Sequence, residues 1–306
     1  MSSLRVALAQ MQLRPEPSVE GFLEHVESLV ADGARRGAEV VVLPELASTG
    51  LLASLDHTST TTTVTDDYHH GLTAYADAIR RGLSRMAADH QVVVIGGSHN
   101  RTAPDGTLRN TAYICHPDGS VESQDKIHLT PPEHAMGTTG GDDLLVTRLG
   151  PFTAAVLICA DIQFPELTRA LVQRGVELII CPSLTWNRRG VHRVRAGSQA
   201  RAMEGQVYVV MSPLVGSSGL PEDAPMYAVG RAFALAPVDK TIGKNDGILV
   251  ESDNDAEGLL LVDLDRDLLM ASRANPETPG LALRRDDLYA RLLAPDDAVA
   301  SNAISS

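Results

Sequence analysis

The order of apolar and polar positions divides the chain into strand-like and helix-like segments. Residues 4–10 alternate as a half-buried strand does. The next segment repeats apolar side chains at helical spacing, and we expect Ser18 to cap this helix and Gly37 to end it. Residues 39–45 then form a short apolar run typical of a strand buried on both faces. The predicted buried face of the helix consists of Phe22, Val26, Leu29 and Val30.

The same alternation continues along the rest of the chain. A Thr-rich stretch, residues 57–70, follows neither periodicity, and we interpret it as a surface loop. Residues 110–115 and 121–126 flank a His-Pro-Asp-Gly turn and predict a hairpin. Further helices are predicted at residues 72–86, 165–174 and 192–204, and further strands at residues 92–97, 152–159, 177–183, 208–212, 231–237 and 258–265.

Length and alternation together indicate one α/β domain. The chain has 306 residues and contains neither an interdomain linker nor an internal repeat. We assign the domain to residues 1–296. Residues 297–306 are rich in Ala, Ser and Asn, and we expect them to form a flexible tail.

Net charge and cysteine usage argue against several classes of function. The formal net charge of −13 argues against a nucleic-acid or anionic-membrane partner, because phosphate binding needs clustered Lys and Arg. No apolar run is long enough to span a bilayer, and the first residues do not resemble a signal peptide. The three cysteines are widely spaced and indicate neither a disulfide framework nor a metal knuckle. A cytoplasmic location is therefore expected.

Cys159 is a candidate nucleophile. It ends the apolar strand at residues 152–159 and precedes a turn into a helix, where backbone N–H groups favour a thiolate. The alternative is a buried structural thiol, since free cysteines are among the most buried residue types. Cys115 and Cys181 have similar surroundings in the sequence, so position alone does not distinguish the three.

Two charged residues at predicted strand ends and one in a loop accompany this thiol. Glu45 follows a buried strand, where burial would raise its pKa towards that of a general base, although a backbone N–H or an Arg would equally satisfy it. Lys126 lies between a strand and an apolar step, where most lysines extend into solvent. Glu133 belongs to the Pro-restrained loop Thr-Pro-Pro-Glu-His-Ala, in which glutamates are usually solvated.

Taken as a set, these residues have the roles that amide hydrolysis requires. The reaction needs a nucleophile, a base that returns its proton to the leaving amine, and a positive group for the oxyanion. Cys159, Glu45 and Lys126 supply these roles without a metal or a cofactor. All three follow predicted strands, where α/β proteins usually build their sites.

Three ordered motifs resemble the nitrilase superfamily of carbon–nitrogen hydrolases. They are VVLPELASTG, DKIHLTPPE and LICADIQFPEL, and the later segments QARAMEGQVYVV, GRAFALAP and LLLVDLD are also similar to that family. The resemblance implies that Glu45 is the base, Lys126 the catalytic lysine and Cys159 the nucleophile. It further implies that Glu133 is a second glutamate, which holds the lysine and the substrate, and that the backbone N–H of Ala160 binds the oxyanion.

The resemblance also implies a fold and an assembly. Members of the family are four-layer αββα sandwiches, and they commonly pair as homodimers or larger homo-oligomers through helices that include the one after the nucleophile. True nitrilases usually carry Trp and Glu after the nucleophile. This chain has Ala160 and Asp161, which is closer to the Cys-Tyr-Asp-x-Arg-Phe-Pro-Glu form of amidase-like branches. Gln163 replaces a frequent Arg, which lowers the expectation of a carbamoyl amino-acid substrate. An amide is the preferred substrate.

Residues near the predicted site leave several alternatives open. Trp186 follows the strand at residues 177–183 and either lines the substrate pocket or packs in the core or a dimer contact. Residues 183–206 resemble a branch sometimes fused to an acetyltransferase domain. The histidines show no metal-ligand spacing, and we predict no metal. Arg188, Arg189 and Arg193 either reach the pocket or, as we prefer, belong to a solvated or interface helix.

Three hypotheses for the function follow. The first is hydrolysis of a small-molecule amide by water through a Cys thioester, with release of ammonia or an amine. The second keeps the fold but changes the bond, to an N-carbamoyl (ureido) group or a nitrile. The third is a catalytically silent ligand-binding or scaffold protein, and the presence of all four reactive positions argues against it.

Overall fold

A first sheet forms the N-terminal half of the protein. A computed structural model describes residues 2–223 and 227–292, so the predicted tail at residues 297–306 lies outside the described residues. Five consecutive strands and one late strand make up this sheet, which we call sheet 1: β1 (Ser3–Gln12), β2 (Val40–Val42), β3 (Val93–Thr102), β4 (Leu108–Cys115), β5 (Val121–Asp125) and β13 (Gly258–Asp265). β1, β2 and β3 are parallel, and β4, β5 and β13 are antiparallel to their neighbours.

A second sheet, sheet 2, is built mainly from later strands. Its members are β6 (Thr147–Leu149), β7 (Phe152–Val156), β8 (Leu178–Ser183), β9 (Tyr208–Ser217), β11 (Phe233–Leu235) and β12 (Ile248–Glu251), and β10 (Tyr227–Ala228) pairs with the end of β9. The two sheets join where Met11 and Gln12 of β1 pair with Leu214 and Val215 of β9. In the described part of the chain this short ladder is the one strand pairing that connects them.

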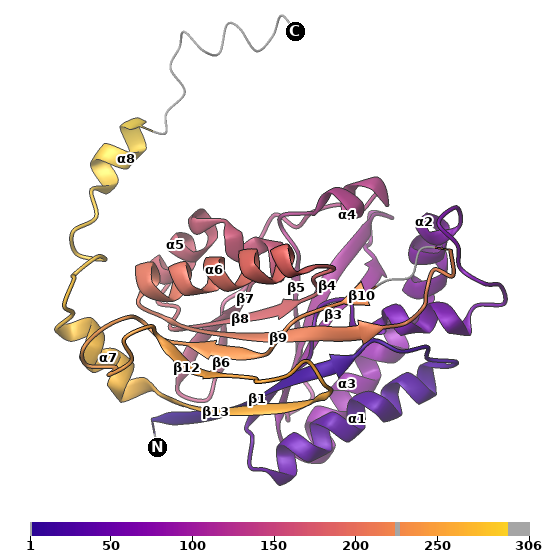
Figure 1. The fold of residues 1–306 in the computed structure, drawn as a ribbon, viewed down its shortest axis with the longest axis horizontal. Helices are drawn as coiled ribbons and strands as arrows, with labels where there is room; N and C mark the ends of the chain where they lie inside the picture. The colour runs from indigo at the N-terminus through magenta and orange to yellow at the C-terminus, as the bar shows by residue number, and fades with distance from the viewer. Residues whose placement is uncertain (1, 224–226, 293–306) are drawn as a thin grey trace, which may run out of the picture.

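Helices cover the outer faces of both sheets (Figure 1). The long helices are α1 (Val19–Arg35) and α3 (Ala76–His90) beside sheet 1, and α5 (Pro165–Gln173) and α6 (Arg188–Gly205) beside sheet 2, while α7 (Arg266–Ala274) and α8 (Asp286–Leu292) follow β13. The shorter turns are η1 (Ala47–Ser54), α2 (Val64–Asp66), η2 (Asp67–Gly71), η3 (Leu72–Tyr75), α4 (Pro131–Ala135) and η4 (Cys159–Gln163). The predicted four-layer αββα sandwich is confirmed. None of the helices within the described ranges is long and apolar enough to cross a membrane.

The period-two alternation of β1 explains the layers. Leu4, Val6 and Leu8 belong to the apolar cluster that contains the strands of sheet 2, whereas Ala7 and Ala9 belong to the cluster that contains the buried sides of α1 and α3. Successive side chains of a strand point to opposite faces, so one strand contributes to both cores. The strand prediction for residues 4–10 is therefore confirmed, with β1 extending slightly beyond it.

The first helix has the predicted ends. Ser18 Oγ accepts a hydrogen bond of 3.1 Å from the backbone N–H of Gly21, which satisfies a donor that the first helical turn leaves free. Gly37 has a φ of +80°, a left-handed conformation that ends the helix. All four residues of the predicted apolar face are buried.

Several predicted elements need correction. The Thr-rich stretch is not a plain surface loop, because its second half winds into α2 and η2 and buries Asp67 and Tyr68. The predicted loop around Glu133 is the short helix α4. The strand before Cys159 ends at Val156, and α6 begins four residues earlier than expected, at Arg188. The strands β6, β10 and β12 and the helices α7 and α8 were not predicted, since they are short or lie at the C-terminal end.

Candidate active site

The predicted reactive residues come from both sheets and meet where the sheets join. Glu45 follows β2 and Lys126 follows β5, so sheet 1 supplies both charges. Cys159 follows β7 of sheet 2, and Ser183 is the last residue of β8. Glu45 and Lys126 are 2% exposed and Cys159 is 6% exposed. Charged side chains this deeply buried need partners, and each of these has them.

A tight turn aims Glu45 inward. Leu46, directly after it, has a left-handed φ of 49°, and its backbone N–H donates to Ser98 Oγ at 3.1 Å. Gly97 lies beneath the turn, where a Cβ would come within 2.0 Å of the Pro44 carbonyl oxygen. Only glycine permits this close approach, so the sequence Gly-Ser in β3 shapes the turn that carries the carboxylate.

Lys126 lies between two glutamates. Its Nζ is 2.6 Å from Glu45 Oε1 and 2.7 Å from Glu133 Oε2. Asn110, from β4, donates its Nδ2 to the same two carboxylates, at 3.2 Å to Glu45 Oε1 and 2.9 Å to Glu133 Oε1. The cluster therefore holds one positive and two negative charges, cross-linked by a neutral amide.

The short helix α4 fixes Glu133. Thr130 precedes this helix, and its backbone N–H and hydroxyl donate to Glu133 Oε2 at 2.8 and 2.7 Å. This is the capping-box arrangement, in which a residue of the first turn reaches back to the cap. Pro131 and Pro132 favour the helical start, because proline lacks the N–H that a first turn leaves free. Glu133 is 5% exposed, so the expectation of a solvated loop glutamate was wrong.

Cys159 occupies a strained turn. Its φ is 46°, in the left-handed region that costs a residue with a side chain about 1–3 kcal/mol. Ser183 Oγ donates to its Sγ at 3.2 Å, and Sγ lies 3.5 Å from the Leu184 carbonyl oxygen. The backbone N–H of Leu184 donates to Glu45 Oε2 at 2.9 Å, so one residue after β8 contacts both the thiol and the carboxylate.

Burial and charge shift the pKa values of the cluster. Burial raises the pKa of Glu45, and the charge of Lys126 only partly offsets this effect. Burial would lower the pKa of Lys126, but the charges of Glu45 and Glu133 raise it overall. Burial acts to raise the pKa of Glu133 too, yet Lys126 and the hydrogen bonds lower it. Burial and then the charge of Glu45 raise the pKa of the Cys159 thiol to about 12. The thiol is thus protonated at neutral pH until a base removes its proton.

Ala160 and Trp186 lie in different environments. Ala160 is 8% exposed and lies next to the thiol in η4. Trp186 is 48% exposed, in the turn between β8 and α6. The core alternative for Trp186 was therefore wrong, whereas a pocket role or a contact with another chain stays a prediction.

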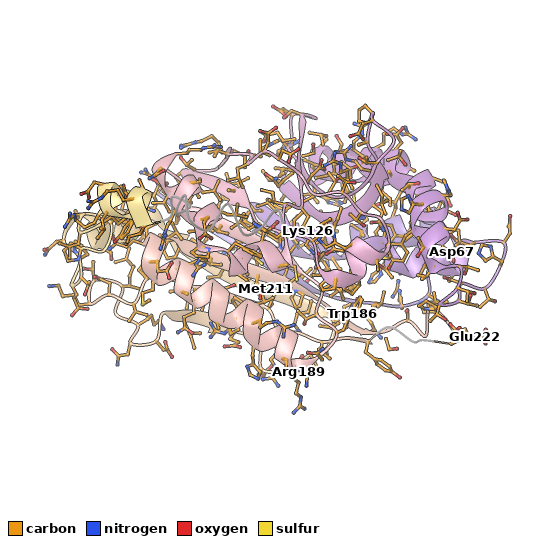
Figure 2. The ribbon with its side chains drawn as sticks, turned by 90° about the horizontal axis from the view of Figure 1, so that it is seen from above. Asp67, Lys126, Trp186, Arg189, Met211 and Glu222 are labelled. Carbon is orange, nitrogen blue, oxygen red and sulfur yellow. The ribbon has the colours of Figure 1, made fainter. Side chains whose placement is uncertain are left out.

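The arginines that the sequence left as candidates for the pocket lie outside the buried cluster, and so does His57. Arg188, Arg189 and Arg193 are exposed on α6, as the preferred solvated-helix interpretation expected, and Figure 2 shows Arg189 pointing outward at the edge of the molecule. His57 pairs with Asp67 at 2.7 Å. Across residues 2–223 and 227–292, no group of three or more His, Cys, Asp or Glu side chains has the arrangement of a metal site.

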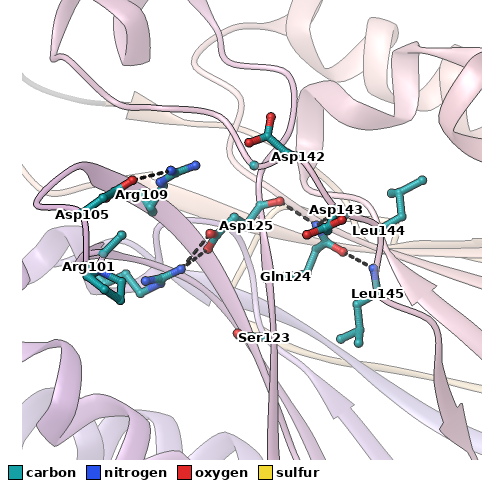
Figure 3. A pocket seen from close by; sticks show the side chains of 13 residues that line it. Arg101, Asp105, Arg109, Ser123, Gln124, Asp125, Asp142, Asp143, Leu144 and Leu145 are labelled. Atoms are coloured by element: carbon teal, nitrogen blue, oxygen red, sulfur yellow. Dashed lines mark hydrogen bonds and ion pairs between the residues drawn. The ribbon is translucent and has the colours of Figure 1, made fainter.

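A separate hollow of about 660 Å³ lies beside β4 and β5, away from the thiol. Figure 3 shows two ion pairs in its wall, and Asp142 and Asp143 also line it. Arg101 Nη2 contacts both oxygens of Asp125, at 2.8 and 2.7 Å, and Arg109 pairs with Asp105 at 3.2 Å. None of the residues that line the hollow is a Cys, Lys or His, so it lacks the thiol and the ammonium of the Cys159 cluster.

Two residues of the cluster were missed from the sequence. Asn110 was recognised only as the start of a hairpin strand, and its polar neighbours Arg109 and Thr111 do not signal that its side chain is buried. Tyr68 belongs to the stretch interpreted as a loop, and its hydroxyl lies 3.4 Å from Thr49 Oγ1. Burial raises the pKa of Tyr68 to about 12, and the charges of Glu133 and Glu45 act in the same direction.

The sequence profile of the carbon–nitrogen hydrolase family matches residues 5–274. The chain belongs to this family. The match covers most of the chain and confirms the resemblance inferred from the three motifs. It makes the protein a hydrolase of carbon–nitrogen bonds, with the individual substrate still to be assigned.

Curated relatives carry related names. A probable hydrolase of Bacillus subtilis, YhcX, is 33% identical over 94% of this chain, which spans only 54% of the length of that relative. An omega-amidase of Mus musculus is 28% identical over 94% of this chain and 98% of its own length. A nitrilase of Pyrococcus abyssi is 27% identical, over 94% of this chain and all of its own length.

Solved structures show the same fold. A carbon–nitrogen hydrolase from Helicobacter pylori matches with a TM-score of 0.80 at 20% identity, over 96% of this chain and 99% of that one. An amidase from Nesterenkonia matches with a TM-score of 0.72 at 23% identity, over 96% and 98% of the two chains. At these identities the likeness concerns the arrangement of the elements and not the substrate.

Proposed function

We propose that this carbon–nitrogen hydrolase cleaves a small amide through a thioester on Cys159. The observation that carries the proposal is the burial of Lys126 between Glu45 and Glu133, beside a thiol in a strained turn. A buried triad of this kind costs desolvation energy and rarely stabilises a fold better than apolar residues would. Its presence next to a nucleophile therefore favours a chemical role.

The proposed reaction begins with proton transfer. Glu45 takes the proton of the Cys159 thiol, and the raised pKa of Glu45 suits a group that must accept and return a proton near neutral pH. The thiolate then attacks the amide carbon and forms the C–S bond. Lys126 Nζ and the backbone N–H of Ala160 stabilise the negative charge that develops on the carbonyl oxygen.

The second half of the reaction regenerates the enzyme. Glu45 gives its proton to the amide nitrogen, the C–N bond breaks, and ammonia or an amine leaves. Glu45 then deprotonates a water molecule, whose hydroxide attacks the thioester. The C–S bond breaks, a carboxylic acid leaves, and Glu45 returns its proton to the Cys159 thiolate. Amide and water are consumed, acid and amine are formed, and no cofactor or metal takes part.

Glu133 has a supporting role in this proposal. Its carboxylate holds Lys126 from the side opposite Glu45 and lowers the freedom of the ammonium group. Ala160 leaves space beside the thiol where relatives often have an aromatic side chain, and Trp186 is proposed to line the entrance for the substrate.

An amide is preferred over a nitrile or a ureido group. Ala160 and Asp161 follow the nucleophile where true nitrilases have Trp and Glu, and Gln163 removes a cation that would bind a carbamoyl amino acid. The omega-amidase relative, similar over nearly its whole length, agrees with this preference. The nitrilase relative makes nitriles the natural comparison substrates.

The test is ammonia release from a panel of small amides, ω-amides, ureido acids and nitriles. We expect release from at least one amide by the wild-type protein and none by Cys159→Ala, which keeps the fold but lacks the nucleophile. Intact mass spectrometry of the reacting wild-type protein should show an acyl adduct on Cys159. Turnover by Cys159→Ala would overturn the thioester mechanism, and a folded wild-type protein that hydrolyses nothing and forms no adduct would favour the scaffold hypothesis.

The remaining expectations concern location and assembly. A cytoplasmic location and a homodimer or larger homo-oligomer stay predictions. Light scattering of the purified protein measures the assembly directly.

A further inference from the structure

The carboxylate of Asp161 joins two segments of the site that are far apart in the sequence. Asp161 lies in η4, two residues after the thiol, and is 1% exposed. Its Oδ2 accepts hydrogen bonds from the backbone N–H of Ile158 at 3.2 Å and of Ile127 at 3.3 Å. Its Oδ1 accepts one from the backbone N–H of His128 at 2.7 Å. Ile158 precedes Cys159, and the other two residues directly follow Lys126.

The ring of His128 adds a second contact between the same segments. His128 Nδ1 is 3.2 Å from Asp161 Oδ1. The ring stacks on Phe164, at the end of the nucleophile turn, with 3.5 Å between centroids and an angle of 7° between planes. The connection therefore consists of a buried carboxylate and a partly exposed aromatic pair, which can be tested separately.

Burial raises the pKa of Asp161, and the backbone donors around it and the charge of Lys126 act in the opposite direction, in favour of the ionised acid. Three of its partners are backbone N–H groups, which can only donate, and both carboxylate oxygens accept from them. Hydrogen bonds to a charged acceptor are shorter and stronger than those to a neutral one. An amide at this position would turn an NH₂ group towards one set of donors and break that set of bonds.

The carboxylate of Asp161 lies where the two sheets meet, between the segments that carry Lys126 and Cys159. Lys126 belongs to sheet 1 and Cys159 to sheet 2, and the described strand pairing between the sheets is limited to the ends of β1 and β9. The distance between ammonium and thiol therefore also depends on apolar packing between the sheets and on individual hydrogen bonds across the junction. Near the two reacting groups, one such bond joins Leu184 to Glu45, and others converge on Asp161.

We propose that Asp161 is a positioning residue, whose carboxylate fixes Lys126 relative to Cys159 by holding the backbone on both sides of the sheet junction. The inference rests on the proposed function, in which these two groups act on the same carbonyl. A displacement of about 1 Å between reacting groups lowers rates by roughly 10²-fold, so small shifts of this backbone matter.

The principal test is Asp161→Asn, which keeps the shape and removes the charge. On the amide that the wild-type protein hydrolyses best, we expect kcat to fall roughly 10²-fold, with KM unchanged within about twofold, since the residue does not contact substrate. Addition of acrylamide to Cys159, followed by intact mass, should slow in parallel. Wild-type kcat in a folded Asp161→Asn protein would overturn the inference.

The matched control is Phe164→Leu, which removes the stacking on His128 and leaves the carboxylate and its backbone partners in place. We expect this variant to keep kcat close to the wild-type value. An equal loss of kcat in Phe164→Leu would show that the aromatic contact sets the position, and this result would overturn the role of Asp161.

A second variant keeps the test decisive if Asp161→Asn does not fold. Asp161→Glu retains the charge but moves it by one methylene, and we expect a kcat reduced by about tenfold at an unchanged KM. Wild-type kcat in this variant would overturn the inference. Failure of the proposed function has a different signature, because the wild-type protein itself would then release no ammonia from any amide.

Discussion

Two buried cations in this protein are each held between two carboxylates, and only one of them has reactive surroundings. Lys126 lies between Glu45 and Glu133 at the sheet junction. His25, on α1, lies between two other glutamates: its Nδ1 is 2.9 Å from Glu16 Oε1 and its Nε2 is 2.8 Å from Glu257 Oε2.

The two clusters differ in their neighbours. The Lys126 cluster contacts a thiol in a strained turn through Glu45 and Leu184. The His25 cluster contacts backbone and an arginine instead: Glu257 Oε2 accepts from the N–H of Gln12 at 2.7 Å, and Glu16 pairs with Arg14 at 2.9 Å. It ties α1 to β1 and to the connection before β13. A charge pattern alone therefore does not define a candidate active site; the adjacent thiol distinguishes the Lys126 cluster.

The clusters also differ in how pH acts on them. The glutamates raise the pKa of Lys126 above an already high value, so its charge is constant over the physiological range. Burial acts to lower the pKa of His25, but hydrogen bonds to Glu257 and Glu16 raise it above the ordinary 6.5. One cluster is a permanent charge arrangement, and the other changes with pH.

Replacement of the first cation should have the largest effect. Lys126→Met leaves Glu45 and Glu133 buried without a counter-charge, and we expect a loss of about 3–5 kcal/mol in the free energy of unfolding. Ammonia release should fall by more than roughly 10²-fold, because the oxyanion loses a donor. Urea unfolding and the amide assay measure the two effects. A variant as active as wild type would remove Lys126 from the mechanism.

Neutralisation of the base should affect activity more than stability. Glu45→Gln keeps the size of the side chain, and we expect kcat to fall between about 10² and 10⁴-fold, the usual contribution of a general base. The same urea experiment should show a smaller loss of stability than for Lys126→Met. If kcat stayed within about threefold of wild type, another group would have to act as the base.

Replacement of His25 should lower the free energy of unfolding without lowering the rate of ammonia release. His25→Leu removes both hydrogen bonds but leaves Arg14 beside Glu16, and Glu257 is partly exposed, so we expect a loss of about 2 kcal/mol. Ammonia release at a temperature where the variant is folded should match wild type. A large loss of kcat in the folded variant would contradict the division between the two clusters.

The pH dependence of the unfolding free energy should also distinguish the His25 cluster from the Lys126 cluster. Because folding raises the pKa of His25, its contribution to stability is complete below pH 6.5 and declines as pH rises through the higher native pKa. Burial tends to raise the pKa of Glu257, but the hydrogen bond from His25 lowers it overall, so the contribution of Glu257 declines as pH falls below 4.5.

We therefore expect the difference in unfolding free energy between wild type and His25→Leu to be largest between about pH 4.5 and 6.5 and to shrink above this window. Urea titrations at several pH values measure it. A difference that grows as the pH rises above 6.5 would contradict the assignment of a charged His25. The charged groups in the His25 cluster that influence this pH dependence are Glu16, Glu257 and Arg14.

Local sequence predicted the parts of the fold that depend on local pattern. The alternation of β1 and the cap at Ser18 are such parts, because side-chain direction and capping act over a few residues. The motifs around Glu45, Lys126 and Cys159 predicted the family for the same reason. A Thr-x-x-Glu capping signature at Thr130 is a local pattern of the same kind and marks the short helix of Glu133.

Tertiary contacts determined what the sequence did not reveal. Asn110 joins one glutamate from the turn after β2 and one from α4, and no local spacing indicates such a bridge. Tyr68 is buried because η2 folds back on η1, which overrides the polar composition of its stretch. Glu257 is 232 residues from His25, so no local sequence pattern predicts this pair, which only the folded sheets bring together.

The narrow ladder between β1 and β9 has a consequence for refolding. A chain with only sheet 1 formed would contain the carboxylates and the ammonium, and one with only sheet 2 formed would contain the thiol; neither would turn over substrate. Recovery of turnover after dilution from denaturant should therefore lag behind recovery of secondary structure. The recovery of turnover would then mark the last step of assembly, in which one half of the chain docks onto the other.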